Sequence, residues 1–371
     1  MEQEKLDELY KKGLLLDPDN ISGYLKNFEK SSKKSKINES FWKDKRVLIT
    51  GISGFAGSHL AEKLIALNAN ILGLVRRQSV PEYPNLTKIM EKVELFEGNL
   101  TDGSSLLSMI KKFEPEVIFH LAAQSFVPTS FRCPIETYDT NVMGTANLIE
   151  AVRHSDVDVK AIQLACSSEE YGLVYPNEVP IKETNPLRPQ SPYAASKVAI
   201  EMIAEVNVRS HGMPCIITRT FNHTGPRRGL QFVTSVVARQ VAKIQAGLTN
   251  EIIIGNQEPI SDFTDVRDIV EGYLLAVEKG KKGEPYNLGH GIGISIGNLI
   301  KLAAKLGGIE DYKIVIDKNR FRPAEVDILI CDYSKSNKEF GYTPRIPLTK
   351  ALKDNIEYLQ NNPNLLRMER H

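Results

Sequence analysis

The segment TGISGFAG, at residues 50–57, constrains the fold of this chain more than any other stretch. It follows a short apolar run, RVLIT at 46–50, and precedes a helical pattern from Phe55 to Leu67. Glycine lets the backbone turn sharply and approach a pyrophosphate, and the helix N-terminus that follows offers free N–H groups to phosphates. This context predicts a dinucleotide site rather than a tight turn without a ligand. The expected cofactor contacts are Gly51, Ser53, Gly54, Phe55 and Gly57.

Apolar runs and helical patterns continue to alternate along the chain. Further strands are expected at 70–75, 93–98, 116–122, 160–166 and 213–221, with helices at 141–154 and 194–210 between them. Such alternation predicts an α/β fold, a Rossmann-type doubly wound parallel sheet covered on both faces. From about residue 223 the spacing becomes irregular, and helical patterns lie at 234–246, 266–279 and 296–306. We therefore expect a cofactor-binding domain at 46–222 and a smaller, mainly helical substrate lobe at 223–371, with the chain crossing between them.

Residues 1–45 differ from the rest of the chain. They contain two short apolar segments followed by KSSKKSK at 30–36, a polar and like-charged stretch typical of a solvated linker. Such a composition buries little apolar surface, which favours a tethered, partly disordered extension. The alternative is an arm that docks on a neighbouring subunit.

Net charge and cysteine content exclude several classes of protein. The formal net charge is +1, so no overall field favours nucleic acid or a membrane surface, and an anionic ligand must be held by local charges. The four cysteines are far apart and form no CxxC pair, which argues against a zinc cluster or a disulfide framework, so no metal is expected. No apolar run approaches the roughly 18 residues of a membrane helix, and the acidic N-terminus is unlike a secretory signal. We expect a cytoplasmic protein.

The end of the second strand predicts the cofactor type. An NAD-binding fold carries an acid near this point for the ribose hydroxyls, but here the chain reads VRRQS at 75–79. Arg76 and Arg77 suit a 2′-phosphate, because guanidinium pairs with phosphate in bidentate fashion, so NADP is expected over NAD. The alternative is a pair of surface arginines. The loops after the third and fourth strands are expected to line the same cofactor-binding site. The residues expected to contact the cofactor in this trough are Asn99, Leu100, Ala122, Ala123 and Gln124.

A tyrosine–lysine pair predicts the chemistry. SPYAASK at 191–197 places Tyr193 and Lys197 four residues apart, on one face of a helix. A phenol titrates near pH 10, and a nearby ammonium together with a positive nicotinamide ring lowers that value toward a usable acid or base. Ser167 and Glu169 follow the fifth strand, at the sheet edge where ligands bind in such folds. A hydroxyl there orients the reacting oxygen, and a carboxylate moves protons on carbon.

Five segments, in this order, resemble the extended short-chain dehydrogenases/reductases that act on nucleotide sugars. They are TGISGFAG, HLAAQS, SSEEYG, SPYAASK and DFTDVRD. Three more, VRRQS, FNHTGPRRGLQFVT and FRPAEVD, carry the closer resemblance given below. The resemblance covers about residues 44–360. Within that group the chain is most similar to GDP-mannose 4,6-dehydratases and to GDP-4-keto-6-deoxymannose reductases. It implies a nucleotide-diphosphate sugar substrate and a homodimer or homotetramer.

The resemblance also implies roles for single residues. Ser167, Tyr193 and Lys197 match the family triad, and Glu169 matches the acid/base of the dehydratases. The implied dehydratase cycle oxidises C4, eliminates water across C5 and C6, and returns the hydride to C6. The residues implied to hold the substrate are Ser125, Ser168, Asn222, Arg227, Arg228, Arg322 and Glu325.

Several positions depart from the dehydratase pattern. Ser261 stands where relatives usually carry an arginine that holds a phosphate, and Arg320 is a candidate to replace it. The spellings SSEEYG and DFTDVRD are closer to the reductases, and the segment at 40–51 resembles the start of CDP-glucose 4,6-dehydratases. A reductase or 4-epimerase on the same scaffold is therefore the alternative function, and a non-catalytic NADP-binding protein is the second alternative.

Overall fold

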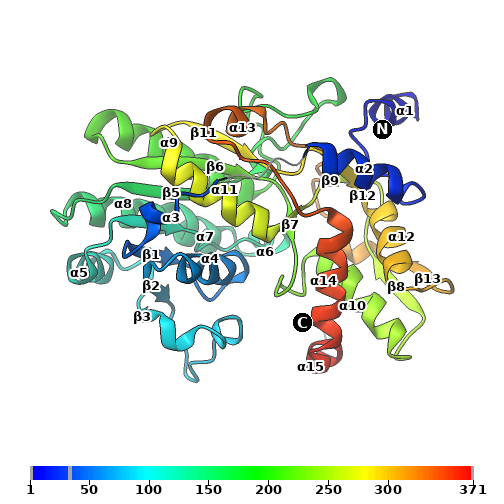
Figure 1. Ribbon diagram of the computed structural model, residues 1–371, viewed down its shortest axis with the longest axis horizontal. Helices are drawn as coiled ribbons and strands as arrows, with labels where there is room; N and C mark the ends of the chain where they lie inside the picture. Colours follow the sequence, from blue (N-terminus) through cyan, green and yellow to red (C-terminus); the bar gives the residue numbers. More distant parts are fainter. Residues whose placement is uncertain (1–2, 32–35, 369–371) are drawn as a thin grey trace.

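A seven-stranded parallel sheet forms the centre of the molecule (Figure 1), in the order β11-β6-β5-β4-β1-β2-β3. The structure is a computed structural model, and it describes residues 3–31 and 36–368. The predicted parallel sheet is confirmed. Its strands are β1 (Arg46–Thr50), β2 (Asn70–Val75), β3 (Glu94–Glu97), β4 (Val117–His120), β5 (Ala161–Ser167), β6 (Cys215–Thr220) and β11 (Pro285–Leu288).

The strands are apolar on both faces because helices cover both sides of the sheet. In β1, Val47 and Ile49 are buried in one core and Leu48 is buried in another. Since successive side chains of a strand point to opposite faces, the two cores lie on opposite sides of the sheet. The first core includes residues of α4 (Phe55–Ala66) and α11 (Val266–Lys279). The second includes residues of α5 (Gly103–Phe113), α8 (Gly144–Arg153) and α9 (Pro192–His211).

The C-terminal part forms the expected smaller, mainly helical lobe, to the right of the sheet in Figure 1. Its core is built by α10 (Val233–Gln245), α12 (Ile296–Leu306) and α14 (Leu348–Gln360), and α15 (Pro363–Arg367) contacts α14. Three small sheets complete it. They pair β7 (His223–Thr224) with β10 (Thr264–Asp265), β8 (Glu251–Ile254) with β13 (Lys313–Ile316), and β9 (Ile260–Asp262) with β12 (Gly293–Ser295) and β14 (Ile328–Leu329).

The chain also returns from this lobe to the large sheet. Strand β11 pairs with β6 at the sheet edge, and α11 packs against α4. Helix α13 (Ser334–Phe340) then contacts both β11 and α11. The sheet is therefore completed by residues far beyond position 222.

The N-terminal extension packs on the C-terminal lobe. Helices α1 (Gln3–Lys11) and α2 (Ile21–Ser31) lie beside β9 and β12 in Figure 1. The Tyr24 hydroxyl lies 3.0 Å from His290 Nε2 and accepts a hydrogen bond from the Leu348 backbone N–H, also at 3.0 Å. The expectation of a partly disordered extension is therefore wrong for residues 3–31, because their apolar side chains complete the lobe core. Residues 32–35 of the expected linker lie outside the described residues.

Within the described ranges, no helix is long and apolar enough to span a bilayer. Cys166, Cys215 and Cys331 are buried free thiols, whereas Cys133 is exposed.

Candidate active site

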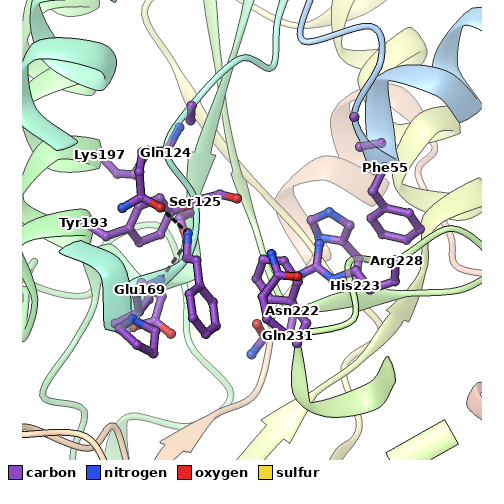
Figure 2. A pocket seen from close by; sticks show the side chains of 18 of the residues that line it. Phe55, Gln124, Ser125, Glu169, Tyr193, Lys197, Asn222, His223, Arg228 and Gln231 are labelled. Carbon is purple, nitrogen blue, oxygen red and sulfur yellow. Dashed lines mark hydrogen bonds between the residues drawn. The ribbon is translucent and has the colours of Figure 1, made fainter. Parts of the chain in front are cut away.

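A cleft of about 1320 Å³ lies between the carboxyl ends of the strands and the C-terminal lobe. Most of the residues predicted from the sequence line it, and they come from segments far apart in the chain (Figure 2). From the sheet domain these are Gly51, Ser53, Gly54, Phe55, Gly57, Arg76, Asn99, Leu100, Ala122, Ala123, Gln124, Ser125, Ser167, Glu169, Tyr193 and Lys197. From the segments after β6 they are Asn222, Arg228, Arg322 and Glu325.

The glycine turn forms a close cradle at one end of the cleft. Gly51 has φ +74°, and a Cβ there would meet the Ala122 backbone at 2.9 Å. A Cβ on Gly57 would lie 2.2 Å from the Gly51 carbonyl oxygen. Helix α4 begins at Phe55, and its N-cap residue Gly54 makes no side-chain capping bond. The first N–H groups of α4 are thus left for a ligand, and this geometry fits a pyrophosphate.

Beyond the turn, the loops after β2, β3 and β4 continue the trough. Arg76 follows the last residue of β2, is exposed and lines the cleft. Arg77 is also exposed but does not line it, so only one of the two predicted arginines faces the cofactor trough.

Local backbone structure brings Ser167 and Tyr193 together. Ser167 is the last residue of β5, and Tyr193 lies in the first turn of α9, whose N-cap Ser191 accepts a bond from the Ala194 N–H at 3.1 Å. Burial raises the pKa of Tyr193, and the neighbouring Ser167 hydroxyl opposes this rise. The protein alone therefore shifts this pKa in the direction opposite to the predicted one, because desolvation of the phenolate outweighs its partners.

Lys197 lies one turn further along α9. Its Nζ donates to the Ala165 carbonyl oxygen at 2.6 Å and lies 5.8 Å from the centre of the Tyr193 ring. Burial lowers the pKa of Lys197. The lysine is thus anchored to β5 beside the tyrosine.

Glu169 and Arg322 face each other across the cleft. Arg322 Nη1 lies 3.4 Å from Glu169 Oε1, and the Arg322 backbone N–H donates to Glu325 at 3.1 Å. Arg322, in the segment after β13, thus places a positive charge next to the Glu169 carboxylate.

An aromatic and basic wall forms the other side of the cleft in Figure 2. The Arg228 guanidinium lies 3.7 Å from the centre of the Phe232 ring and 5.1 Å from that of Phe55. Phe55 also stacks on His223, with ring centres 5.6 Å apart. Burial lowers the pKa of Arg228 to about 10, and its Nε has no hydrogen-bond partner among the described residues. This guanidinium is held by ring faces, so its N–H groups remain available to an anion.

Sequence reasoning did not single out several residues of this wall. His223, Gln231 and Phe232 line the cleft, as does Phe126, which packs edge-on against Phe232. Three of these residues, His223, Gln231 and Phe232, belong to the segment FNHTGPRRGLQFVT, so the family resemblance could have pointed to them. Their aromatic and amide types do not by themselves indicate a ligand.

Two residues predicted to hold the substrate do not line the cleft. Arg227 pairs with both oxygens of Glu62, at 2.7 and 2.8 Å, and donates to the Asn85 carbonyl oxygen at 3.2 Å. Its backbone lies in the left-handed region, with φ +72°. Ser168 is 2% exposed and lies behind the β5 tip. Arg227 and Ser168, assigned to the substrate from the sequence, therefore do not line the cleft, and neither does Arg77, assigned to the cofactor.

Ser261 lines the cleft, as does Arg320. Arg320 Nε pairs with Asp317 at 3.0 Å, and its Nη1 donates to the Ile253 carbonyl oxygen at 2.6 Å. These bonds leave fewer donors for a phosphate than a free arginine has.

The sequence profile of the family described as GDP-mannose 4,6 dehydratase matches residues 48–355. The chain belongs to this family. It is 34% identical over 339 residues to the GDP-mannose 4,6-dehydratase of Yersinia enterocolitica, covering 81% of this chain and 90% of the relative. It is 36% identical over 326 residues to GDP-mannose 4,6 dehydratase 2 of Arabidopsis thaliana, covering 83% of this chain and 85% of the relative. The family predicted from the motifs is confirmed.

Among solved structures, RMD from Pseudomonas aeruginosa complexed with NADPH is similar. It is 29% identical, its TM-score is 0.73, and the match covers 86% of this chain and 99% of that chain. Residues 1–47, which include the packed N-terminal extension, lie outside the matched family profile.

Proposed function

We propose that this protein is a nucleotide-sugar 4,6-dehydratase that acts on GDP-mannose. One observation carries the proposal: Ser167, Glu169, Tyr193 and Lys197 converge on one cleft with the glycine turn. The family membership supports the same activity. Because Glu169 stands beside the tyrosine, the site has a second proton-transfer group, as elimination of water requires.

The cofactor in this proposal is NADP, held by the glycine turn, the start of α4 and the trough formed by Asn99, Leu100 and residues 122–124. Arg76 lines the cleft directly after β2, so we assign it to the 2′-phosphate, and positions 76–79 contain no acid that would repel that group. When bound, the nicotinamide accepts a hydride and later returns it.

The diphosphate and sugar are assigned to the opposite wall. Arg228 offers unpartnered N–H groups, and Asn222 and Arg322 line the same side. With a net charge of +1, the protein has no overall field for an anionic substrate, so these local donors supply the attraction. Arg322 also contacts Glu169, which links substrate binding to the acid/base.

Each catalytic residue then has one task. Tyr193 takes the proton of the C4 hydroxyl, with Ser167 orienting the same oxygen. Once C4 is a ketone, Glu169 removes the acidified C5 proton and passes it to the C6 hydroxyl, which leaves as water. Lys197 holds a positive charge beside the phenol. Closure of the lobe over the sheet keeps bulk water from the intermediate.

The test is turnover of GDP-mannose with NADP present only in catalytic amount. We expect a 4-keto-6-deoxy product by mass spectrometry, with no net formation of NADPH. The Glu169→Gln variant should oxidise C4 but stop before water loss, so reduced cofactor should accumulate on the enzyme. As a matched control, Glu178→Gln changes a carboxylate that pairs with Arg188 outside the cleft and should behave as wild type.

A second candidate is a reductase of a 4-keto sugar, favoured by the SSEEYG spelling and by the similarity to NADPH-bound RMD. This activity would consume NADPH in proportion to a keto-sugar substrate and leave GDP-mannose untouched. The same assay therefore separates the two functions.

The proposed assembly is a homodimer or homotetramer. Helices α7 (Pro134–Tyr138) and α9 contact each other and carry exposed apolar side chains, among them Ile135, Met202 and Val206. Light scattering should give a mass of two or four chains, and Val206→Glu should lower it. A monomer at all concentrations would contradict the proposal.

A further inference from the structure

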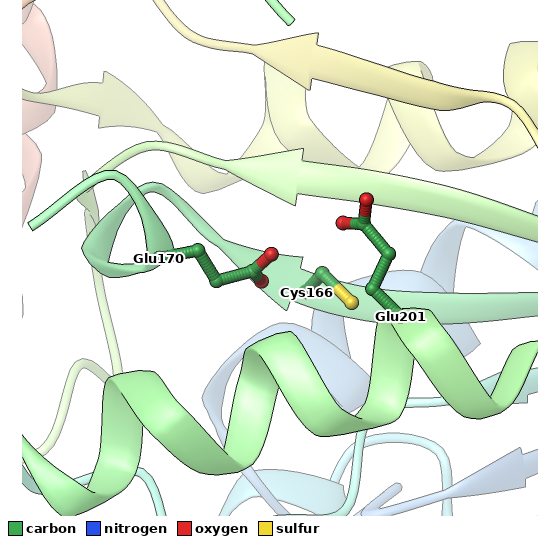
Figure 3. A group of neighbouring side chains, drawn as sticks. All are labelled: Cys166, Glu170 and Glu201. Atoms are coloured by element: carbon green, nitrogen blue, oxygen red, sulfur yellow. The ribbon is translucent and has the colours of Figure 1, made fainter. Parts of the chain in front are cut away.

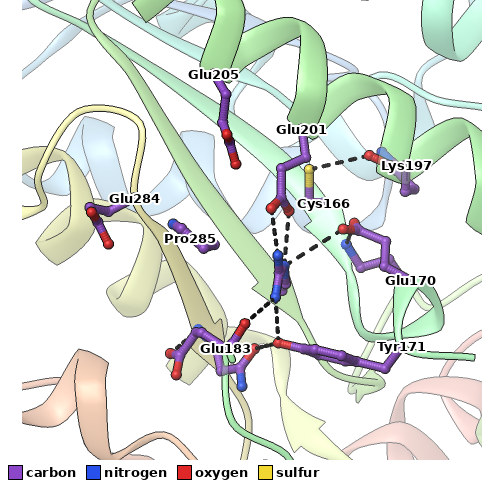
Figure 4. A network of polar contacts seen from close by, with 12 residues as sticks. Cys166, Glu170, Tyr171, Glu183, Lys197, Glu201, Glu205, Glu284 and Pro285 are labelled. Carbon is purple, nitrogen blue, oxygen red and sulfur yellow. Dashed lines mark hydrogen bonds and ion pairs between the residues drawn. The ribbon is translucent and has the colours of Figure 1, made fainter. Parts of the chain in front are cut away.

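A buried cluster of charged side chains lies directly behind the tip of β5 (Figures 3 and 4). Glu170, Glu201 and Arg219 are 0%, 1% and 4% exposed. They come from the turn after β5, from α9 and from β6, respectively. None of them lines the cleft, and the proposed reaction does not use them.

Arg219 is the cation of this cluster. Its Nε donates to Glu201 Oε2 at 2.9 Å, and its Nη1 donates to the Tyr171 hydroxyl and the Glu183 carbonyl oxygen. Glu170 Oε2 lies further away, 3.7 Å from Arg219 Nε. Cys166 Sγ, Glu170 and Glu201 lie within 4.8 Å of one another, as metal ligands would, but the guanidinium already supplies a cation there.

The charges do not balance when both carboxyls are ionised. Around Arg219, two carboxylates and one guanidinium leave a net negative charge in a site away from water, and an unpaired buried charge is costly. The nearby Lys197 Nζ donates to the Ala165 carbonyl oxygen and pairs with neither carboxylate. Glu170 Oε2 is buried and has no donor among the described residues. A proton on this oxygen would neutralise the cluster and turn an unsatisfied acceptor into a donor toward Glu201.

Glu170 is also bonded to the proposed catalytic centre. Its Oε1 accepts the Ser167 backbone N–H at 2.8 Å, and the Ser167 Oγ accepts the Glu169 N–H at 3.2 Å. The Ser167 hydroxyl is also the neighbour that lowers the pKa of Tyr193. Glu170 is therefore joined to the surroundings of the phenol through Ser167.

We propose that Glu170 carries a proton at neutral pH, shares it with Glu201 and acts as a positioning residue for Ser167 and Tyr193. The neutral carboxyl holds the β5 tip without placing another negative charge behind the phenol. The kinetic part of this inference rests on the proposed function, because it assumes that Tyr193 transfers the proton.

The surroundings of Glu170 support a proton held at neutral pH. Burial and the Glu201 carboxylate raise the pKa of Glu170 to about 8, although Arg219 and the Ser167 N–H oppose the rise. The other ionisable groups around the cluster are Cys166 on β5, Tyr171 on the following turn, Tyr193 and Lys197 on α9, and Glu183. A charged Glu170 raises the pKa of Tyr193 further, so loss of the proton should disfavour the phenolate.

The kinetic test compares pH profiles of kcat for GDP-mannose. Wild-type activity should fall as pH rises through about 8, and the alkaline fall of Glu170→Gln should move to higher pH. The glutamine amide mimics the protonated acid, since its oxygen accepts from Ser167 and its nitrogen donates to Glu201. Glu170→Ala should lower kcat at every pH with little change in KM, and Glu170→Gln should restore most of that loss.

Glu183→Gln is the matched control. Burial also raises the pKa of Glu183, but its carboxylate accepts from the Asn287 N–H and does not contact Ser167. This variant should keep the wild-type profile. If Glu170→Gln and wild type have the same pH profile of kcat, the proposed positioning role of Glu170 is overturned.

A second measurement does not depend on activity. In wild-type protein labelled with carbon-13 at the glutamate carboxyls, one resonance should titrate near pH 8 and remain when Glu183 is replaced by Gln. Absence of such a resonance would overturn the shared proton, even if GDP-mannose is turned over. If the resonance is present but GDP-mannose is not turned over, the shared proton is supported and only the proposed function is rejected.

Discussion

Arg227 and Arg228 are adjacent in the sequence, yet their guanidinium groups meet different environments. Arg227 is neutralised by Glu62, whereas Arg228 lies against the rings of Phe55 and Phe232. Residue type and position predicted the same role for both, and only the direction of each side chain separated them. Three residues expected to contact a ligand, Arg77, Ser168 and Arg227, do not line the cleft.

Tyr193 is the residue whose replacement tests the proton transfer. Tyr193→Phe should lower kcat roughly 10²- to 10⁴-fold, the usual contribution of a general acid or base. The fold should be kept, because the ring remains and only a hydroxyl is lost. Steady-state kinetics and thermal melting check this result. Tyr175→Phe, at an exposed tyrosine, should be silent, and full activity of Tyr193→Phe would contradict the mechanism.

Arg76 tests the choice of cofactor. Arg76→Ala should weaken NADP binding by roughly 10- to 100-fold, the loss expected for a hydrogen bond to a charged group, and leave NAD binding nearly unchanged. Titration calorimetry with both nucleotides measures the difference. Arg77→Ala removes the same charge one residue away from the cleft and should have a smaller effect. Equal loss of NADP and NAD affinity would argue against a 2′-phosphate contact.

At the scale of elements, the buried parallel strands could be predicted well, because they read as continuous apolar runs. The helices predicted at 266–279 and 296–306 have the bounds observed for α11 and α12. Strand β11 was missed, since PYNL is four residues long and half polar, and its place in the sheet depends on pairing with β6. The packed extension was missed because its apolar residues find partners only in the folded lobe.

The packed extension makes a testable contribution to stability. Tyr24→Phe removes the hydroxyl that meets His290 and accepts the Leu348 N–H, which leaves a buried donor unsatisfied. We expect the free energy of unfolding to fall by about 1–3 kcal/mol. Urea unfolding measures it. Tyr10→Phe removes a more exposed hydroxyl, bonded to Asn298, and should cost less. Equal stability of Tyr24→Phe and wild type would show that this contact does not hold the extension.

At the scale of the whole molecule, buried ionisable groups determine how stability depends on pH. Burial raises the pKa of Asp262 and of Asp268 to about 7, and burial with the charge of Glu201 raises that of Glu170 to about 8. Burial also lowers the pKa of His120 and His223 to about 3 and of His59 and His290 to about 4. Over part of the pH range, these carboxyl groups are thus protonated in the folded state but ionised in the unfolded state. The histidines are neutral in the folded state at pH values where they are protonated in the unfolded state.

The resulting pH dependence follows from linkage. A raised carboxyl pKa lowers stability as pH rises from its unfolded value, near 4, to its folded value of about 7 or 8. A lowered histidine pKa lowers stability as pH falls below about 6.5. Between about pH 4 and 6.5 the carboxyl and histidine contributions to stability oppose each other. We therefore expect a broad maximum at mildly acidic pH and a decline from about 6.5 to 8, measured as the melting temperature across pH.

Asp268→Asn tests the alkaline side of this profile. One oxygen of Asp268 accepts both the Arg345 and Ile346 N–H groups, so an asparagine oxygen can keep both bonds without titrating. The decline between pH 6.5 and 8 should become shallower than in wild type. Asp139→Asn, at an exposed site, is the control and should leave the slope unchanged. An unchanged slope in Asp268→Asn would show that this carboxyl is ionised throughout.

The sequence by itself determined the strand–glycine–helix unit, the α/β class, the family and most residues of the cleft, because these depend on local periodicity and on motifs with fixed spacing. Tertiary structure decided which side chains face the cleft, how the N-terminal extension packs and where a single arginine lies between two buried carboxyls. These features depend on contacts between segments more than 15 residues apart, such as Arg219 with Glu201 or Tyr24 with His290, and on the desolvation of each group. Neither these contacts nor the desolvation can be worked out from the sequence until the position of each group in the fold is known.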